Sequence, residues 1–421
     1  MGLATGGLSR PAVNYHDRVA LTLRLPTYSG YRRILLVHWA ELEARTLDGS
    51  PSMSSRRHIA LLTTTLDVSG AERVLALLAN GLAEAGYRVS VVALQRRSGH
   101  LARLIHRADI DVVDLGMRGP FDLRVVWRLR TWLRQAGVSV VYTFLPHAHI
   151  VGRLAGRLAG VSRVLSSQQV ANWGSAWRQS LEAWTDRWCD RIVAVSDGVK
   201  DDLVHRMGVP AAHIAVIFNA IPVSAYESRR APFTGTTAGA AVFGSASRLA
   251  PEKDHASLIR GFAEAYRVNP RLRLRLAGTG PLAPALKQLI GDLHVGMAVE
   301  MLGQVTDIQA FYDSLDVYVQ PSRTEGLPCA VIEAMAMERP VIATNVPGNR
   351  DAVVHGDTGW LIEPSSPSAW ATALLDSVQD RTGAVARGRA GRQRTARLFD
   401  SAQMMAGTLQ LLRDIDAPPQ C

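Results

Sequence analysis

The sequence predicts an α/β protein made of two doubly wound domains that face each other across a cleft. Its 421 residues suffice for two domains with separate cores. Short apolar runs alternate with helical periodicity over 56–225 and again over 241–400, which is typical of βαβ units with right-handed crossovers. The segment between them, 226–240, is polar and rich in turn formers, as linkers are.

The first 55 residues are expected to form an extension outside this fold. They are rich in arginine and show no sustained apolar periodicity. Met53 stands shortly before the first clear strand signal. The segment therefore fits an extension or an upstream start codon.

Within the first domain, the pattern opens with a strand at 59–62 and a helix over 71–85. Four further apolar runs predict strands at 89–94, 138–144, 163–167 and 192–196. The second domain repeats the alternation, with strands expected at 241–247, 271–277, 299–302, 317–320 and 341–344, and helices near 257–268 and 329–337. The last residues, 401–421, are expected to form a helix that packs back on the first domain. In open parallel sheets ligands bind at the carboxyl ends of the strands, so the cleft is the expected site.

The composition is that of an ordinary soluble globular protein, with 47% hydrophobic and 20% charged residues. Cys189, Cys329 and Cys421 are too scattered for a disulfide framework or a metal-ligand motif, which favours a reducing cytoplasm. No run approaches the roughly 18 consecutive apolar residues of a membrane-spanning helix, and the N-terminus lacks the pattern of a secretory signal. The protein is expected to be cytoplasmic.

Basic residues concentrate in one part of the chain. The net charge is +10, and residues 53–230 carry +9 of it. Such a surface suits nucleic acid, anionic lipid or a phosphorylated ligand. Because the chain has no zinc finger, RNA-binding aromatic signature or leucine zipper, no nucleic-acid partner is expected.

Apolar residues at helical spacing over 124–134 alternate with arginines and include Trp127 and Trp132. The pattern fits a packed surface helix with an arginine face, and alternatively an interfacial membrane helix. Trp173, Trp177, Trp184 and Trp188 extend the second interpretation.

The segment 321–336 carries two carboxylates, Glu325 and Glu333, at a strand-to-helix junction. The start of the helix offers free N–H groups and a positive dipole to an anion. Ionised carboxylates only accept hydrogen bonds, which suits the many hydroxyl donors of a sugar. A capping glutamate and a solvated helix glutamate explain the same spacing equally well.

Two further strand-end loops carry charge or glycine. Arg248 and Lys253 stand five residues apart after the strand at 241–247, close enough to hold one diphosphate. Only three lysines occur in the chain, and this scarcity favours a function for Lys253. Gly278 and Gly280 form a turn that nearly matches a GxGxxA dinucleotide fingerprint, so a nicotinamide-dependent oxidoreductase stays open as a weaker interpretation.

In the first domain, Gly70 and Glu72 lie in a glycine turn between the first strand and the first helix. This turn is a candidate diphosphate or acceptor loop, and a simple βα turn is the alternative. His147 and His149 follow the strand at 138–144 at its carboxyl end, where substrate-facing residues gather.

Taken together, these segments resemble a family of known enzymes. EGLPCAVIE with its Glu325–Glu333 spacing, the RLAPEK loop, LAGTGP, the opening SGAERV and the stretch from Asp190 to Asn219 look like a retaining glycosyltransferase of the family 4 kind, with the GT-B fold. The likeness runs from about residue 56 to 417. It implies a nucleotide-diphosphate sugar, in particular a UDP-sugar, bound mainly by the second domain.

The resemblance also implies roles for individual residues. Glu325 contacts the donor sugar, Glu333 holds the ribose, and Arg248 with Lys253 neutralises the leaving diphosphate, so that no metal or other cofactor is required. The remaining donor-binding residues are then Gly278, Gly280, Gly326, Leu327 and Pro328. The first domain takes the acceptor, a glycan or a polyprenyl-linked sugar.

Two positions depart from the family pattern. Ser69 stands where relatives often have the first of two glycines, and Phe144 aligns with the catalytic-loop histidine of many relatives, which leaves His147 as the nearest substitute. The resulting hypothesis is a hexosyl- or N-acetylhexosaminyltransferase of cell-envelope or exopolysaccharide synthesis, at the inner face of the cytoplasmic membrane. The alternative is a catalytically silent sugar-nucleotide-binding or scaffold protein on the same fold.

Overall fold

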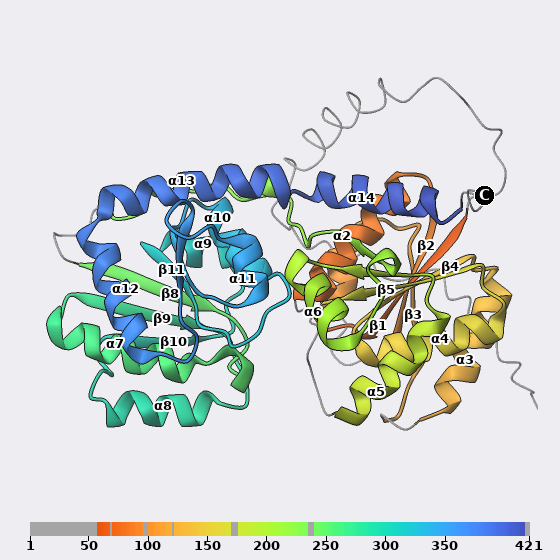
Figure 1. Cartoon of the computed structure of the whole chain (residues 1–421), viewed down its shortest axis with the longest axis horizontal. Coiled ribbons are helices and arrows are strands. Elements are labelled where there is room, and N and C mark those ends of the chain that lie inside the picture. The colour runs from red at the N-terminus through yellow and green to blue at the C-terminus, as the bar shows by residue number, and fades with distance from the viewer. Residues whose placement is uncertain are drawn as a thin grey trace, which may run out of the picture. The chain divides into compact units, whose positions relative to one another are not determined.

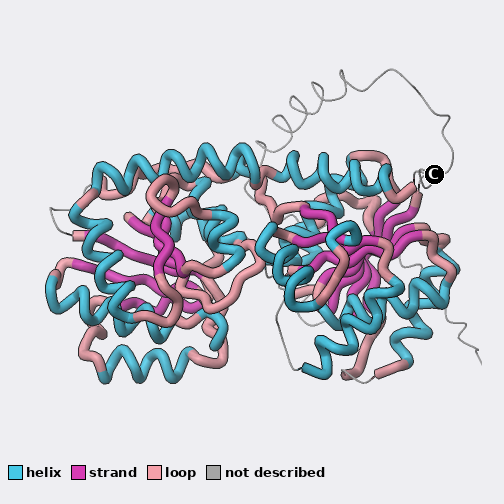
Figure 2. Tube along the Cα trace, viewed as in Figure 1, coloured by secondary structure: helices cyan, strands magenta, loops and turns pink. Residues whose placement is uncertain are grey.

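The computed structural model describes residues 57–67, 70–95, 100–119, 122–169, 176–234 and 240–416. All of them belong to one compact unit, Met53–Cys421. The expected N-terminal extension lies outside the described residues. Within the unit, two parallel sheets are each flanked by helices on both faces (Figures 1 and 2).

The first domain contains a seven-stranded parallel sheet with the order β3-β2-β1-β4-β5-β6-β7. Its strands are β1 (His58–Thr65), β2 (Arg88–Gln95), β3 (Asp111–Asp114), β4 (Val140–Phe144), β5 (Arg163–Gln168), β6 (Arg191–Ala194) and β7 (Ile214–Val216). Its helices are α2 (Gly70–Glu84), α3 (Arg124–Ala136), α4 (Pro146–Ala159), α5 (Ala176–Thr185) and α6 (Asp197–Met207), with short 3-10 turns at His100–Leu104, Asp186–Trp188, Ala211–His213 and Val223–Ala225.

Strand β1 shows why both faces of this sheet are covered. Successive side chains of a strand point to opposite faces. Ile59 and Leu61 enter a core formed with α2, whereas Ala60 and Leu62 enter a second core formed with α3 and α4. Because both sets are apolar, β1 reads as a continuous hydrophobic run, as central parallel strands do.

A six-stranded parallel sheet, ordered β10-β9-β8-β11-β12-β13, forms the second domain. Its strands are β8 (Ala241–Ala246), β9 (Leu272–Ala277), β10 (Val299–Gly303), β11 (Val317–Gln320), β12 (Val341–Thr344) and β13 (Gly359–Ile362). The chain also forms α7 (His255–Val268), α8 (Ala283–Asp292), α9 (Ile308–Asp313), α10 (Cys329–Ala336), α11 (Pro347–Ala352), α12 (Pro367–Gln379), α13 (Arg381–Leu398), α14 (Ser401–Asp414) and a 3-10 turn at Pro251–Lys253.

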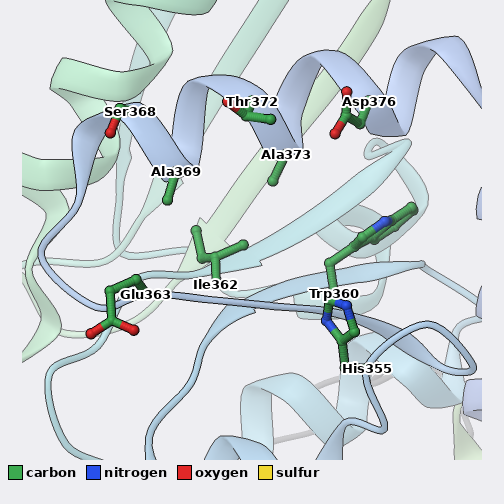
Figure 3. A pocket seen from close by; sticks show the side chains of 9 residues that line it. All are labelled: His355, Trp360, Ile362, Glu363, Ser368, Ala369, Thr372, Ala373 and Asp376. Atoms are coloured by element: carbon green, nitrogen blue, oxygen red, sulfur yellow. The ribbon is translucent and has the colours of Figure 1, made fainter.

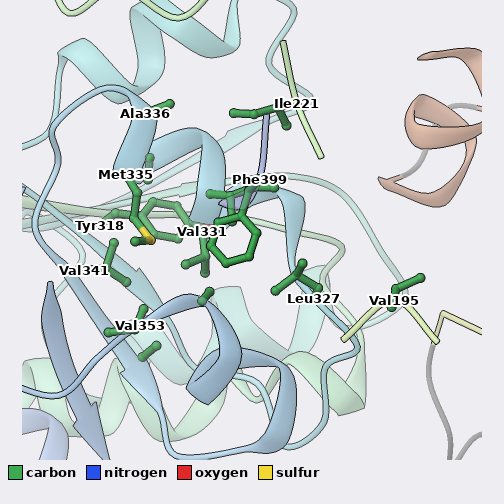
Figure 4. Packing of buried hydrophobic residues seen from close by; sticks show 14 of the residues in the cluster. Val195, Ile221, Tyr318, Leu327, Val331, Met335, Ala336, Val341, Val353 and Phe399 are labelled. Atoms are coloured by element: carbon green, nitrogen blue, oxygen red, sulfur yellow. The ribbon is translucent and has the colours of Figure 1, made fainter. Parts of the chain in front are cut away.

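One hydrophobic cluster is shared by the two domains. Val195, which follows β6 in the first domain, belongs to the same buried cluster as Leu327 and Val331 of the second domain (Figure 4). Phe399, between α13 and α14, is fully buried in it. Apolar packing therefore joins the carboxyl edge of the first sheet to the loop that carries the expected site.

The segment after residue 225 is anchored on the second domain over its described part. Arg230 donates to Asp316 at 2.7 Å, and the main-chain N–H of Phe233 donates to the same carboxylate at 2.7 Å. Arg339, fully buried, donates to the Arg230 carbonyl. Residues 235–239 lie outside the described residues.

The chain returns from the second domain to the first between α13 and α14. Asp400 caps α14 through the N–H of Ala402 at 2.9 Å and accepts the N–H of Val223 at 3.1 Å. Met405 of α14 packs so closely on α2 that a Cβ at Gly81 would lie 2.6 Å from its sulfur atom. The final segment of the described chain is therefore part of the first domain's core.

Candidate active site

Glu325 lies in the loop that follows β11, at the carboxyl edge of the second sheet. Its Oε1 atom accepts hydrogen bonds from Gln320 at 2.7 Å and from Ser322 at 2.6 Å. Lys253 Nζ donates to the same oxygen at 2.5 Å. The carboxyl group is buried, so three donors fix its orientation and the lysine balances its charge.

The loop that carries Arg248 and Lys253 follows β8, the strand next to β11. Arg248 is exposed and pairs with Glu252, whereas Lys253 pairs with Glu325. The main-chain N–H of Arg323 donates to the Glu252 carbonyl at 2.8 Å, which ties this loop to the Glu325 loop. The structure thus brings Lys253 to Glu325 and leaves the Arg248 guanidinium at the rim.

Gly278 and Gly280 let the loop after β9 pack directly on the Arg248 loop. A Cβ at Gly278, where φ is +135°, would lie 2.0 Å from the Ser247 carbonyl oxygen. A Cβ at Gly280 would lie 2.4 Å from the carbonyl oxygen of Leu249. Since main-chain atoms cannot move aside cheaply, both positions require glycine. In this structure the two glycines position the cationic loop.

Glu333 lies on α10 and is almost completely buried. Tyr312 donates to its Oε2 at 2.8 Å, and Arg73 of the first domain donates to its Oε1 at 3.0 Å. The Tyr226 hydroxyl also interacts with this carboxylate. Burial and the Glu333 charge raise the pKa of both tyrosines, so both hydroxyls keep their protons and can donate.

Two helices begin at the junction between the domains. Cys329 opens α10 and Gly70 opens α2, and the Cys329 sulfur lies 3.9 Å from the Gly70 carbonyl oxygen. Burial, and then the charge of Glu333, raises the pKa of the Cys329 thiol to about 12, so it stays protonated. The start of α10 therefore lies against the start of α2, and a helix N-terminus of this kind favours an anion.

Gly326, Leu327 and Pro328 connect Glu325 to α10 and contact the first domain. A Cβ at Gly326 would lie 1.6 Å from the Gln169 carbonyl oxygen, at the end of β5. Asn219 donates to the Leu327 carbonyl oxygen at 3.3 Å, and Pro328 is the residue before the first turn of α10. In the structure these residues hold the two domains together at the site.

On the first domain, the turn residues and the histidines occupy different environments. Glu72 lies in the first turn of α2 and is buried, while Ser69 is outside the described residues. His147 is half-buried in the first turn of α4. The residue before this helix, Leu145, has φ +69°, a conformation that is costly for a branched side chain and that concentrates at functional loops.

His149 belongs to the core. It is 1% exposed, and its Nδ1 lies 2.8 Å from the carboxylate of Glu182. Burial lowers the pKa of His149 although Glu182 raises it. The neighbouring Arg153, also fully buried, donates to the Glu182 carbonyl oxygen at 3.1 Å. His149 thus helps to fix α5 on α4.

Sequence reasoning did not single out five side chains that complete the site: Arg73, Tyr226, Tyr312, Gln320 and Ser322. Gln320 and Ser322 give a local signal, because a polar pair directly after a buried apolar strand is unusual. Arg73 and the two tyrosines give none, since they reach Glu333 from distant segments.

An open hollow of about 420 Å³ lies on the second domain between β13 and α12 (Figure 3). It is lined by His355, Trp360, Ile362, Glu363, Ser368, Ala369, Thr372, Ala373 and Asp376. It shares no residue with the site described above. In the described part of the chain, no group of three or more His, Cys, Asp or Glu side chains is arranged to hold a metal ion.

Two protein-family models match the chain. The model described as Glycosyltransferase Family 4 matches residues 68–225, and the model described as Glycosyl transferases group 1 matches residues 232–394. The chain belongs to the family 4 type of GT-B glycosyltransferases. The turn at Gly278 and Gly280 therefore belongs to a glycosyltransferase, and the interpretation of the chain as a nicotinamide-dependent oxidoreductase was wrong.

This glycosyltransferase is similar to individual known proteins. It is 28% identical over 268 residues to a glycogen synthase of Mycobacterium tuberculosis, covering 63% of this chain and 61% of that protein. It is 26% identical over 280 residues to the Escherichia coli UDP-Gal:alpha-D-GlcNAc-diphosphoundecaprenol alpha-1,3-galactosyltransferase, covering 62% of this chain and 71% of that one. The crystal structure of Anabaena HepE in complex with UDP and glucose superposes with a TM-score of 0.75 at 20% identity, covering 85% of this chain and 100% of that one. That likeness shows the GT-B fold.

Proposed function

We propose that this glycosyltransferase moves a hexose or N-acetylhexosamine from a UDP-sugar to a glycan or polyprenyl-linked acceptor, with retention of the anomeric configuration, in cell-envelope or exopolysaccharide synthesis. The observation that carries the proposal is the grouping of Lys253, Glu325 and the start of α10 at the junction between the domains. A cation, a carboxylate that accepts hydrogen bonds from hydroxyls, and a helix N-terminus together fit a sugar joined to a diphosphate.

In the proposed reaction, the bond between the anomeric carbon and the diphosphate oxygen breaks, and its electron pair stays on the diphosphate. Lys253, Arg248 and the first N–H groups of α10 neutralise that growing charge, so no metal is needed. Lys253 exchanges its partner Glu325 for the diphosphate. Glu325 then accepts hydrogen bonds from the sugar hydroxyls.

The acceptor hydroxyl attacks the anomeric carbon from the face that the diphosphate leaves, which retains the configuration. Its proton goes to the departing phosphate oxygen, so the step balances without a further base. In this proposal His147, in the first turn of α4, contacts the acceptor. Gly70 and Glu72 border the same junction at the start of α2.

The choice of UDP and of a lipid-linked acceptor draws support from the activities and ligands of similar proteins. The E. coli relative uses UDP-Gal and a diphosphoundecaprenol acceptor. HepE has UDP and glucose bound. At identities of 26% and 20%, these two proteins support a class of donor and acceptor for this chain, not a particular sugar.

A surface on the first domain supports attachment to an anionic membrane. We call it the Trp/Arg face; it consists of exposed side chains of α3, α4 and α5 and their flanks: Leu123, Arg124, Trp127, Arg157, Leu158, Leu181, Trp184 and Arg187. Five of the ten large apolar side chains exposed in the described part of the chain lie here. Arg130 stacks over Trp127 and Arg187 over Trp184, as at a lipid headgroup boundary.

Three arginines of α3 form contacts within the first domain. Arg128 pairs with Asp122, and Arg130 and Arg134 donate to carbonyl oxygens at the end of α4. On this face Arg124, Arg157 and Arg187 are exposed and have no carboxylate partner among the described residues, although Arg187 also donates to the Trp184 carbonyl oxygen at 2.9 Å. Trp173 and the side chain of Trp177 lie outside the described residues. In the described chain no helix has the length and apolar character to cross a bilayer.

The test of the proposed function is a donor screen. The purified protein is mixed with UDP-glucose, UDP-galactose, UDP-N-acetylglucosamine and GDP-mannose, with and without undecaprenyl-diphosphate-linked N-acetylglucosamine. Thermal shift reports donor binding, release of nucleoside diphosphate reports turnover, and NMR of the product reports the anomeric configuration. Transfer with retention from a UDP-sugar supports the proposal. Binding without any turnover, with EDTA or added metal, favours the silent scaffold instead.

A further inference from the structure

Arg73 is the side chain of the first domain that reaches Glu333 of the second. It lies in the first turn of α2, three residues after Gly70, and its guanidinium is 3.0 Å from Glu333 Oε1. The Arg73 side chain is 44% exposed, whereas that of Glu333 is 4% exposed. A partly exposed arginine of one domain thus supplies the positive charge for a buried carboxylate of the other.

The other partners of Glu333 described here are neutral tyrosines. Tyr312, fully buried, donates to Oε2 at 2.8 Å. Tyr226, also buried, interacts with the same carboxylate. Burying a carboxylate with only hydroxyl donors is unfavourable, because its full charge must be balanced as well as hydrogen-bonded. Arg73 provides that balance among these contacts.

The contacts described so far do not use all the hydrogen-bonding capacity of the Glu333 carboxylate. An ionised carboxylate offers about four acceptor positions on its two oxygens. Arg73 occupies one on Oε1 and Tyr312 one on Oε2. Tyr226 interacts with the same carboxylate, so about one further acceptor position is open to a hydroxyl donor, such as a ribose hydroxyl of the proposed nucleotide sugar.

We propose that Arg73 is a positioning residue of the donor site: it balances the charge of Glu333 and orients this carboxylate for the ribose hydroxyls, so that a residue of the acceptor-side domain sets nucleotide recognition in the donor-side domain. The proposal rests on the proposed function. It adds that α2, whose first residue Gly70 contacts Cys329 at the start of α10, is linked to the proposed ribose site through one ion pair.

The test compares each nucleotide with its 2′-deoxy analogue. UDP, 2′-deoxy-UDP, GDP and 2′-deoxy-GDP are titrated by calorimetry into the wild-type full chain, Arg73→Gln, Arg73→Lys and Glu333→Gln. The wild type is expected to prefer the ribonucleotide by about tenfold or more, as for a hydrogen bond to a charged group. Arg73→Gln and Glu333→Gln should each reduce that preference to less than about threefold, and Arg73→Lys should restore part of it.

The matched control is Arg88→Gln, which removes an exposed arginine at the start of β2 in the same domain. It should keep the wild-type preference. A double-mutant cycle adds a readout that a merely structural role would not give: Arg73→Gln should have no further effect on the preference in the Glu333→Gln background. Thermal unfolding midpoints identify any variant that fails to fold, and Arg73→Lys then carries the comparison.

The outcomes separate the two proposals. If the wild type binds ribonucleotides but Arg73→Gln leaves the preference unchanged, the role of Arg73 is wrong and the proposed function stands. If the wild type binds none of the nucleotides at millimolar concentration, the proposed function fails, and the role of Arg73 fails with it.

Discussion

Lys253 Nζ lies 2.5 Å from Glu325 Oε1, which joins the loop after β8 to the loop after β11. The cation expected to meet the donor diphosphate and the carboxylate expected to meet the donor sugar therefore neutralise each other. In the proposed reaction, the bound donor separates this pair and takes each partner as its own contact. The relationship makes both residues direct targets for substitution.

We expect Glu325→Gln and Lys253→Ala each to lower turnover by about two to three decades. Each change removes a charged contact made chiefly in the transition state, which corresponds to roughly 3–4 kcal/mol. The measurement is kcat with the best donor of the screen, together with the thermal unfolding midpoint.

Matched controls are Glu363→Gln and Lys287→Ala, which alter exposed side chains of the same domain. They should leave kcat unchanged. Activity near that of the wild type in both Glu325→Gln and Lys253→Ala would contradict the site assignment.

Gly326→Ala is expected to loosen the junction between the domains. Its Cβ would lie 1.6 Å from the Gln169 carbonyl oxygen and 3.2 Å from Val195, so the loop or β5 must shift. We expect a lower unfolding midpoint, a larger radius of gyration by small-angle X-ray scattering, and reduced kcat. Gly296→Ala, where nothing lies within 4 Å, is the control. An unchanged scattering profile and kcat would show that the loop accommodates the methyl group.

The central strands were predictable because they are buried on both faces. The apolar runs at 59–62, 317–320 and 341–344 each lie within strands of the two sheets. Three strands were not predicted: β3, β7 and β13, each at the edge of its sheet. Edge strands are short and bury few side chains; in β3, for example, three of four residues are exposed. Their apolar pattern is therefore too weak to read.

In the site too, residues with a local sequence signal were predictable, whereas contacts between distant segments were not. Glu325, Arg248 and Lys253 stood out because each follows an apolar strand, where parallel sheets place their ligands. Arg73 lies 260 residues from Glu333 in the chain, and their contact depends on the packing of two domains. No spacing within one segment encodes such a pair. The sequence predicted helix α10 and singled out Glu333. It did not predict that Arg73 balances the charge of Glu333.

Below neutral pH, His255 is expected to weaken the fold. Burial and then Lys253 lower the pKa of His255 from 6.5 to about 4, so the folded protein holds it neutral. The unfolded chain takes up a proton as the pH falls through 6.5. Stability is therefore lost between about pH 6.5 and 4, by about 3 kcal/mol at most for this group.

Urea unfolding at pH 7.5, 6.5, 5.5 and 4.5 tests this expectation in the wild type and in His255→Gln. The free energy of unfolding of the variant should fall less steeply on acidification than that of the wild type. His205→Gln, which alters an exposed histidine on α6, should follow the wild type. Parallel curves for His255→Gln and the wild type would mean that His255 titrates alike in both states.

Deletion of residues 1–52 should leave a folded and active protein. The segment shows no core-building pattern, and the compact unit begins at Met53. We expect the unfolding midpoint and kcat of the truncated chain to match those of the full chain. An insoluble or inactive product, with the same tag and expression host, would show that the segment contributes to folding or activity.

Attachment to anionic membrane is expected to depend on the Trp/Arg face. Leu123, Trp127 and Trp184 are 77%, 58% and 53% exposed, and the basic side chains around them favour anionic headgroups. Each arginine near such a surface contributes about 1 kcal/mol, screened over about 10 Å at 0.1 M salt. Co-sedimentation with liposomes of phosphatidylglycerol and phosphatidylcholine should therefore need the anionic lipid and fall as salt is added.

Two sets of variants separate charge from apolar insertion. Changing Arg124, Arg157 and Arg187 to Gln should remove most of the salt-sensitive part of binding, because these exposed arginines have no carboxylate partner in the described residues. Changing Trp127 and Trp184 to Ser should lower the binding that persists at high salt. Val268→Ser with Met297→Ser, which alters two exposed apolar residues of the second domain, should change neither. If the wild type stays in the supernatant at low salt, the face is a solvated surface of the first domain, and a water-soluble glycan becomes the acceptor to test.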